Sequence, residues 1–507
     1  MFPKTSADAA PNTHSFEVTP LVKPTGFREY DARWWFGHPA SDKAPDLNLM
    51  GVQALGMGLG TLIQELGTGP DIVVGHDFRS YSMSIKHALV SGLMAAGARV
   101  KDVGLALSPV AYFAQFELDV PSVAMVTASH NDNGWTGVKM GCERPLTFGP
   151  DEMGRLRDIV LGGDWQLKAG GGYEFIENFA ERYIEAHSER KLFERKIRAI
   201  AACGNGTAGA FAPQVLERCG IEVIHMDTEL DHSFPNYNPN PEDMVMLHAM
   251  RDRVLETGAD VALGFDGDGD RCGVVDNEGE EIFADKVGVM LARDISAVHP
   301  NSTFVADVKS TGLFLTDPVL LEQGAKTDYW KTGHSYIKRR VNELGAIAGF
   351  EKSGHFFFNA PIGKGYDDGI VTALAVCDML ERNPDKTMAD LRRALPVTFG
   401  SPSMSPYCAD ETKYAVVERV VKRFEEMQAN KEQVGGQTIR DLVTVNGVRV
   451  VAEDGTWGLV RASSNEPKLV VVVESPVSEE RKVEMFHAVD AVLRENEEVG
   501  EYKQGLE

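Results

Sequence analysis

Short apolar segments alternate with longer amphipathic ones through most of the chain. Runs such as Val123–Val126 and Val261–Phe265 consist largely of aliphatic residues and end in Gly, Asp or small polar residues, which is typical of buried strands. Between such runs, segments such as Ser82–Ala96 and Asp367–Arg382 carry apolar residues at helical spacing. The alternation of strand, turn and helix predicts an α/β protein with mostly parallel sheets.

The pattern recurs and then changes near the C-terminal end. An apolar strand that runs into a Gly, Asp or Asn turn and then a helix occurs at Val73–Asp77, Ile200–Asn205 and Val305–Lys309. As a repeat this is weak, because many α/β proteins contain similar units. Beyond Pro396 a helix at Thr412–Gln428 precedes several short strands, and a final helix follows. That order predicts a smaller α+β domain.

Chain length requires several domains, since a single core stops growing near ~250–300 residues and this chain has 507. A Gly-rich hinge at Gly170–Gly172 separates two expected helices, Asp151–Leu161 and Tyr173–Phe193. We place the first domain boundary there.

A helix is also expected at Met50–Leu66, although its glycines lower its helix propensity. The pattern Gly56-x-Gly58-x-Gly60 within it does not follow a strand, as the glycines of a dinucleotide-binding loop would.

The charge balance and the cysteines limit the classes of partner and compartment. With 51 basic and 75 acidic residues the net charge is −24, which argues against nucleic acid and anionic membranes as partners. The six cysteines are scattered and form no Cys-x-x-Cys pair, as expected of a reduced, cytoplasmic protein. We find neither a signal peptide nor a run of ~18 apolar residues that could span a membrane. Monomer and dimer are both compatible with the sequence.

One stretch, residues 122–141, concentrates candidate chemistry. Ser129 follows the strand Val123–Val126, at the strand end where α/β folds carry their functional groups. His130, Asn131 and Lys139 follow within one tight excursion of the chain. A polar surface turn is an equally good interpretation of this stretch alone. The nucleophile elbow Gly-x-Ser-x-Gly is missing around Ser129.

The strongest single signal is Asp266-Gly-Asp268-Gly-Asp270, which comes directly after a predicted strand. The glycines let the backbone fold so that the three carboxylates converge, and converging carboxylates repel one another unless a cation lies between them. Oxygen ligands favour a hard ion, Mg²⁺ or Ca²⁺. The EF-hand pattern fails because Arg271 and Asn277 stand where Gly and Glu are required. A solvated acidic turn is the alternative.

Two further loops carry polar residues next to predicted strands. Glu351 and Ser353 follow a strand at a spacing that suits adjacent sugar hydroxyls, and His334 and His355 could flank the same site. The segment Arg461–Pro467 combines an arginine, two serines and an asparagine between two strands, which suits a phosphate. Taken singly, each is as well explained by an ordinary polar loop. No Walker A motif is present, so use of ATP is not expected.

Together, these loops resemble the four signature loops of the α-D-phosphohexomutases, in the same order along the chain. The likeness covers nearly the whole sequence, including Phe27–Asp31. Lys331–Ser335, Phe356–Phe358 and Asp367–Gly369 are most similar to the bacterial phosphomannomutase/phosphoglucomutase branch. The resemblance implies three similar α/β domains with mostly parallel mixed sheets and a smaller C-terminal α+β domain around a central cleft. The implied domains are residues 1–168 with the phosphoserine loop, 169–280 with the metal-binding loop, 281–394 with the sugar-binding loop and 395–507 with the phosphate-binding loop.

The resemblance also implies a reaction, in which hexose 6-phosphate and hexose 1-phosphate are interconverted through a phosphoserine enzyme and a hexose 1,6-bisphosphate. Mannose is the first expected sugar and glucose the second, and the partner is a small sugar phosphate. The catalytic residues implied are Ser129, Lys139, Arg271, His334 and Arg28. Mg²⁺ is implied at Ser129, Asp266, Asp268 and Asp270. Substrate contacts are implied for Glu351, Ser353, His355, Lys309, Arg461, Ser463, Ser464 and Asn465.

Phosphoryl transfer depends mainly on charge neutralisation and positioning, which this set of residues supplies. A base must take the proton of the acceptor hydroxyl, and His334 and Lys139 are both candidates. The chain departs from the family pattern at Asp132, Phe350, Lys352 and Asn465. Because Phe350 and Lys352 flank Glu351, they bear on the choice of sugar. Alternatives are a phosphoglucosamine mutase, a Mg²⁺-dependent phosphomonoesterase, or a non-catalytic sugar-phosphate sensor.

Overall fold

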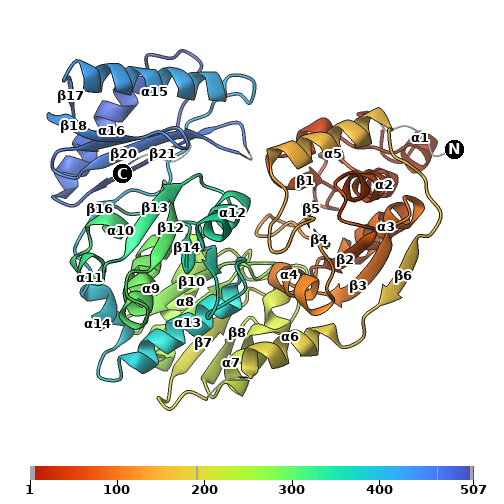
Figure 1. Ribbon diagram of the computed structural model, residues 1–507, viewed down its shortest axis with the longest axis horizontal. Coiled ribbons are helices and arrows are strands. Elements are labelled where there is room, and N and C mark those ends of the chain that lie inside the picture. Colours follow the sequence, from red (N-terminus) through yellow and green to blue (C-terminus); the bar gives the residue numbers. More distant parts are fainter. Residues whose placement is uncertain (1–5, 9, 190–191, 465, 503–505, 507) are drawn as a thin grey trace. The chain divides into compact units, whose positions relative to one another are not determined.

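The computed structural model describes residues 6–8, 10–189, 192–464, 466–502 and 506, and the chain divides into two compact units (Figure 1). The first unit comprises Met1–Phe283 and Ser353–Ala389, and the second comprises Ala284–Lys352 and Asp390–Glu507. Each unit is described by itself below. Among the described residues, no helix combines the length and the apolar character needed to cross a bilayer.

The first domain is built on a six-stranded mixed sheet with the order β1-β5-β4-β2-β3-β6. Strands β2, β3, β4 and β6 run parallel, whereas β5 is antiparallel to both β4 and β1. Its strands are β1 (Ala32–Trp35), β2 (Asp71–His76), β3 (Arg99–Leu105), β4 (Ser122–Val126), β5 (Trp135–Gly141) and β6 (Gly172–Phe175). Its helices are α1 (His14–Val18), the 3-10 turn η1 (Pro24–Gly26), α2 (Leu49–Glu65), α3 (Ser82–Ala95), α4 (Ser108–Glu117) and α5 (Pro150–Gly162).

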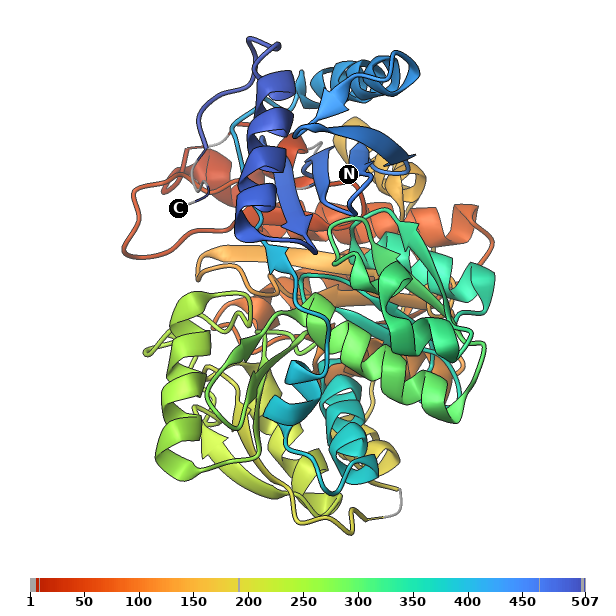
Figure 2. The ribbon, with the colours of Figure 1, turned by 90° about the vertical axis from the view of Figure 1, so that its left-hand side faces the viewer.

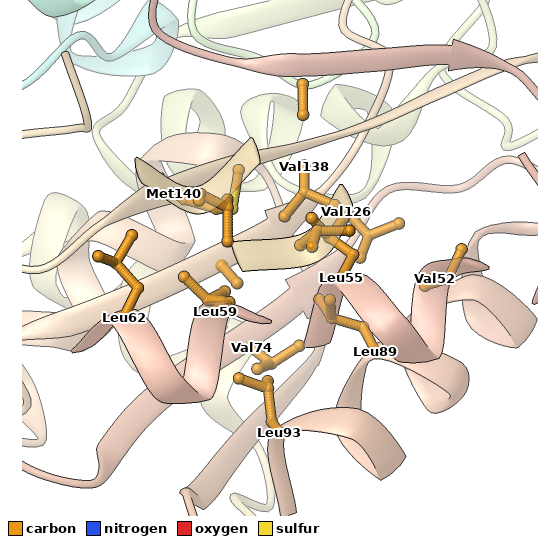
Figure 3. Packing of buried hydrophobic residues seen from close by; sticks show 14 of the residues in the cluster. Val52, Leu55, Leu59, Leu62, Val74, Leu89, Leu93, Val126, Val138 and Met140 are labelled. Atoms are coloured by element: carbon orange, nitrogen blue, oxygen red, sulfur yellow. The ribbon is translucent and has the colours of Figure 1, made fainter. Parts of the chain in front are cut away.

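Apolar faces of α2 and α3 bury one side of this sheet (Figure 3). Asn48 caps α2 by accepting a hydrogen bond from the backbone N–H of Gly51 (2.8 Å). Gly56 and Gly92 let the two helix backbones touch, since a Cβ atom on either would lie within 2.2 Å of a carbonyl oxygen of the other helix. The glycines of α2 therefore serve helix packing. The expected helix is confirmed, and Gly56, Gly58 and Gly60 all lie within it.

The second domain repeats the strand order of the first in a five-stranded sheet, β11-β10-β9-β7-β8. Strand β7 lies parallel to β8 and β9, and β10 returns antiparallel to β9. The elements are α6 (Phe179–Ser188), β7 (Arg198–Ala202), η2 (Thr207–Ala210), α7 (Ala212–Arg218), β8 (Glu222–Met226), α8 (Met244–Thr257), β9 (Val261–Phe265), β10 (Cys272–Asp276) and β11 (Glu281–Ile282). The first unit also contains β15 (Phe356–Phe358) and α13 (Gly369–Arg382).

In the second unit, the third domain shows the same order of first, second and third strands, with β12 between β13 and β14 and all three parallel. Its elements are α9 (Ala284–Val298), β12 (Thr303–Asp307), α10 (Leu313–Thr316), α11 (Pro318–Glu322), β13 (Lys326–Trp330), α12 (His334–Leu344) and β14 (Ala348–Phe350). Helix α14 (Met388–Arg393) leads to the last domain.

The last domain is an antiparallel sheet packed against α15 and α16, and Figure 2 shows α16 lying along the sheet. Its elements are β16 (Phe399–Gly400), α15 (Lys413–Ala429), β17 (Gln433–Val434), β18 (Gln437–Val443), β19 (Val448–Ala452), β20 (Trp457–Ala462), β21 (Leu469–Ser475) and α16 (Glu479–Leu493). Three similar α/β domains and a smaller α+β domain confirm the predicted fold class. The boundaries between domains and the central cleft stay predictions.

Two local expectations about the first unit were wrong. Tyr173–Phe193 does not form one helix, because Gly172–Phe175 pairs with β3 as an edge strand and the helix begins only at Phe179. Pairing with an existing sheet edge outweighs the local helical pattern there.

Lys139 does not lie in a tight excursion after Ser129. It lies on β5, opposite Met125 of β4, so a returning strand carries its amine back beside the serine loop.

Candidate active site

Ser129 lies in the turn between β4 and β5, and its backbone is strained. Its φ angle is 51°, in the left-handed region that residues other than glycine seldom adopt. The side chain is buried, and its Oγ donates a hydrogen bond to Oδ2 of Asp266 (3.0 Å) and lies 3.3 Å from Nδ1 of His130. Burial beside Arg271 and Arg33 holds the pKa of His130 well below its usual range, so this imidazole is neutral.

Asp77 and Arg79, in the loop after β2, hold the backbone of the serine turn. Nη2 of Arg79 donates to the carbonyl oxygens of Ser129 (2.8 Å) and Asn131 (2.7 Å), and its Nη1 pairs with Asp77. The Asp77 carboxylate also accepts from Oγ1 of Thr127 (2.9 Å), which in turn accepts from the N–H of Ser129 (2.9 Å). The local pattern predicts only a turn after the strand here, although the Asp-x-Arg pair that follows the strand directly is a further signal in the sequence.

Replacing Arg79 by methionine is expected to destabilise the first domain strongly. Both side chains of the Asp77–Arg79 pair are 1 % exposed, so loss of the cation leaves a buried carboxylate unpaired, which costs about 3–5 kcal/mol. The midpoint of thermal unfolding should fall clearly, whereas Arg99→Met, which breaks an exposed pair with Asp71, should barely move it. Equal shifts in the two variants would contradict the role given to Arg79.

The three aspartates converge at the end of β9. Asp266, Asp268 and Asp270 are fully buried, and each offers a carboxylate oxygen within 4.8 Å of the others. Gly267 makes the close approach to the serine turn possible, since a Cβ there would lie 2.6 Å from the carbonyl oxygen of Ser129. Among the described residues, Oδ1 of Asp268 and Oδ1 of Asp270 have no hydrogen-bond partner. A buried, oxygen-only donor set with unsatisfied oxygens fits Mg²⁺.

Lys139 supplies a counter-charge to this cluster. Its Nζ donates to Oδ2 of Asp268 (2.7 Å) and to Asp270, and the hydroxyl of Ser108 donates to the same Asp268 oxygen (2.6 Å). Burial raises the pKa of Asp268, but the charge of Lys139, the hydrogen bonds from Lys139 and Ser108 and the charge of Arg33 together hold that pKa well below its usual range. Burial, together with the other two carboxylates, raises the pKa of Asp266 to about 8. Burial and repulsion from the neighbouring carboxylates thus disfavour the charged form of Asp266, and a bound cation would relieve that repulsion.

Arg271 and His355 border the same cluster. Nε of Arg271 donates to Nε2 of His355 (3.0 Å) and its Nη1 donates to Glu242 (2.8 Å), while Asp266 lies 3.7 Å from Nε. The Nδ1 of His355 is 3.0 Å from Oδ2 of Asp367, which fixes the orientation of the ring. Two of the predicted residues thus lie beside the triad, in contact with each other.

Arg33, which is not among the predicted site residues, reaches the serine turn. Its guanidinium donates to Oδ1 of Asn131 (2.5 Å) and to Asp31 (2.9 Å), and it interacts electrostatically with Arg271 and Asp268. The predicted Arg28 lies half-buried before β1, where its N–H donates to the carbonyl oxygen of Asp31 (2.9 Å). Both arginines belong to the charged cluster at residues 26–33. The two arginines differ in that Arg33 lies on β1, whereas Arg28 lies before it.

In the second unit, hydrogen bonds join the loops of the predicted sugar site. The N–H of Gly333 donates to the buried carboxylate of Glu351, directly before His334 begins α12. Asp307 accepts from Oγ1 of Thr332 (2.9 Å) and lies 3.9 Å from Nζ of Lys309. Lys309, His334 and Glu351 are thus carried by loops that contact one another. Ser353 belongs to the first unit, where it is half-buried.

Phe350 and Lys352, the two residues beside Glu351 that differ from the family pattern, both have contacts within the fold. The ring of Phe350 is fully buried against Phe314 (5.5 Å between ring centroids) and Phe304 (5.8 Å). Lys352 directs its Nζ to Asp285 (3.7 Å) and to the carbonyl oxygen of Ser401 (3.4 Å). Core packing therefore accounts for the presence of Phe350, and pairing with Asp285 accounts for that of Lys352.

The predicted phosphate loop follows β20. Arg461 is buried, with its Nε donating to Oδ1 of Asn446 (2.8 Å) and its Nη2 to Oγ of Ser464 (3.3 Å). Oγ of Ser463 accepts from the N–H of Glu466 (3.3 Å). The predicted Asn465 lies outside the described residues. Among the described residues, both side-chain acceptors of Arg461 are neutral oxygens, which leaves the arginine's charge available for an anion.

Four family models match the chain in succession. They are described as phosphoglucomutase/phosphomannomutase α/β/α domains I, II and III, at residues 25–166, 174–279 and 283–399, and the C-terminal domain, at residues 409–492. Together they account for most of the sequence.

Individual relatives give the same assignment. The chain is 33% identical to a phosphomannomutase/phosphoglucomutase of Pseudomonas syringae, over 93% of this chain and 96% of that protein. It is also 33% identical to one of Pseudomonas putida, over 89% of this chain and 91% of that protein. A solved phosphoglucomutase/phosphomannomutase family protein of Burkholderia thailandensis superposes with a TM-score of 0.81 at 27% identity, over 94% and 98% of the two chains. The chain therefore belongs to the phosphoglucomutase/phosphomannomutase family, and it is a mutase.

Proposed function

We propose that this enzyme interconverts hexose 6-phosphate and hexose 1-phosphate, with mannose as the first sugar and glucose as the second. The observation that carries the proposal is the buried serine hydroxyl bonded to an aspartate triad (Oγ to Asp266, 3.0 Å) in a member of this family. The relatives named above support a hexose phosphate mutase and do not favour the phosphoglucosamine alternative. We keep the cytoplasm as the proposed compartment, because the six cysteines are scattered along the sequence and form no Cys-x-x-Cys pair.

In the proposed cycle, Ser129 carries a phosphoryl group at its Oγ. Attack by a free sugar hydroxyl on that phosphorus forms the new P–O bond and breaks the bond to Oγ, which leaves serine and a hexose 1,6-bisphosphate. After the intermediate reorients, Oγ takes the other phosphoryl group back. Each half of the cycle therefore conserves phosphate, and no ATP is needed.

The residues of the first unit have distinct proposed tasks. Asp266, Asp268 and Asp270 would hold Mg²⁺, which when bound supplies neutralisation of the phosphoryl charge. Arg79 fixes the direction of the Ser129 side chain through two backbone carbonyl groups. Arg271 and Arg33 present guanidinium groups near the same turn, where negative charge is concentrated during transfer.

Residues of the second unit are proposed to bind the sugar phosphate. Glu351 would accept hydrogen bonds from sugar hydroxyls, and Arg461, with Ser463 and Ser464, would hold the phosphate that does not react. We assign the base to His334 before Lys139, because the Lys139 amine already donates to two carboxylates.

The test is incubation of the enzyme with mannose 1-phosphate, Mg²⁺ and a trace of mannose 1,6-bisphosphate. We expect mannose 6-phosphate as the product, with little free phosphate. Release of free phosphate would favour the phosphomonoesterase, and no turnover would favour the sensor. The same assay with glucose and glucosamine phosphates ranks the sugars, and a higher kcat/KM for glucosamine phosphate than for mannose phosphate would overturn the assignment.

A further inference from the structure

The turn between β18 and β19, residues 444–447, lies directly against the phosphate-binding arginine. Oδ1 of Asn446 accepts from Nε of Arg461 (2.8 Å) and from the backbone N–H of Thr332 (3.3 Å). Gly447 permits this approach, with a φ of 74°, because a Cβ there would lie 2.1 Å from the carbonyl oxygen of Val460 and 3.0 Å from Cβ of Arg461. One amide oxygen therefore joins a residue of the last domain to a loop of the third.

The bond matters because Arg461 has no other strong partner in the described part of the chain. None of the ion pairs described there includes Arg461, although the residue is only 5% exposed. Its remaining side-chain contact is the longer bond to Ser464 (3.3 Å). A buried guanidinium needs hydrogen-bond acceptors that leave its charge uncompensated if it is to bind an anion, and a neutral amide oxygen meets that requirement.

The connection continues from Thr332 to the predicted sugar site. The next residue, Gly333, donates its N–H to the carboxylate of Glu351, and His334 follows. The path from Arg461 through Asn446 to Glu351 therefore consists of three hydrogen bonds and the two adjacent residues Thr332 and Gly333. A shift of Arg461 would therefore displace Asn446 and, through it, the loop of Thr332 and Gly333 that is bonded to Glu351.

A separate set of contacts holds the third and last domains together. Arg449 stacks on Trp457 (3.6 Å) and Tyr329 (4.3 Å) and donates to the carbonyl oxygens of Val308 (3.0 Å) and Ser310 (2.7 Å). Glu474 accepts from Lys286 (3.1 Å), Thr311 (3.0 Å) and the N–H of Gly312 (2.8 Å). Because these buried contacts secure the junction, Asn446 is not needed to keep the domains associated.

We propose that Asn446 is a positioning residue for the substrate phosphate, which fixes the Arg461 fork and aligns it with the loop of Thr332 and Gly333. This inference rests on the proposed function, in which Arg461 binds the phosphate that does not react. The role requires one oxygen acceptor at position 446 and no charge. It therefore predicts that neither leucine, which lacks the acceptor, nor aspartate, whose charge would compensate that of Arg461, can replace asparagine there.

The test compares Asn446→Leu with Asn446→Asp. For Asn446→Leu we expect KM for both hexose 1-phosphate and hexose 6-phosphate to rise about tenfold, the effect of one lost bond to a charged group, with kcat within about threefold. Asn446→Asp should also raise KM for both substrates about tenfold, because its carboxylate pairs with Arg461 and competes with the substrate phosphate, although both donors keep an acceptor. If the leucine variant does not fold, Asn446→Ala takes its place, and a parental KM in that variant overturns the proposal.

A matched control is available in the same domain. Asn496 makes the same kind of bond, from Nε of Arg419 to its Oδ1 (2.7 Å), and in the described part of the chain its side chain is hydrogen-bonded to no candidate site residue. Asn496→Leu should leave KM unchanged.

Calorimetric titration with hexose 6-phosphate separates this inference from the proposed reaction, because weaker binding in Asn446→Leu supports the inference even if the parent shows no turnover. Equal binding in the parent and Asn446→Leu overturns it, as does parental binding in Asn446→Asp.

Discussion

Replacing Ser129 by alanine is expected to reduce mutase activity by about 10⁴-fold or more, because the phosphoryl carrier itself is removed. The substitution deletes one buried oxygen and its bond to Asp266, and it leaves the strained backbone as it is. Protein stability should therefore change little. Intact mass after incubation with hexose 1,6-bisphosphate should show one added phosphoryl group on the parent and none on the variant.

Ser296→Ala is a suitable control for that experiment. Ser296 is fully buried in α9, and its hydroxyl makes no hydrogen bond among the described residues, so its loss should affect neither activity nor phosphorylation. Full mutase activity in Ser129→Ala would contradict the phosphoserine mechanism. Phosphorylation of that variant at the parental level would show that another residue carries the group.

Replacing Asp268 by asparagine is expected to weaken Mg²⁺ binding and to reduce activity by about 10²-fold or more. Asp268 accepts from Lys139 and Ser108 through Oδ2, while its Oδ1 has no partner in the described structure and is free for a cation. An amide removes the negative charge and puts a donor where an acceptor is needed. Titration calorimetry with Mg²⁺ measures the affinity independently of turnover.

Asp243→Asn provides the matched control in the same domain. Asp243 caps α8 by accepting from the N–H of Val245 (2.8 Å), and asparagine caps a helix equally well, so metal affinity and activity should both stay at the parental level. If Asp268→Asn bound Mg²⁺ as tightly as the parent, the aspartate triad would not be the metal site. Parental activity after complete removal of divalent ions would likewise exclude a required metal.

Local patterns were enough to predict the fold class and most elements, because strands and helices here carry clear periodicities. The failures have physical causes that a local pattern does not contain. Tyr173 lies in an edge strand because β3 offered a free edge, with its hydroxyl bonded to Asp102 (3.0 Å). Trp135–Gly141 was missed as a strand because its alternation includes Gly137, Lys139 and Gly141.

The candidate site could be predicted in its residue types but not in all of its contacts. The order of the four loops indicated Ser129 and the aspartates. It could not show that Arg33 reaches Asn131, or that Arg79 supports the turn, because these contacts join strands distant in sequence. Likewise, Phe350 and Lys352 stood out as departures, and only the structure shows that their side chains have partners within the fold.

The left-handed backbone at Ser129 has a consequence for the evolution of this enzyme. At a φ of 51° a side chain costs about 1 kcal/mol relative to glycine, so the most stable residue at this position is one that cannot accept a phosphoryl group. Selection for thermal stability alone would remove the serine, whereas selection for activity retains it. The turn is thus a place where stability and activity impose opposite demands on one residue.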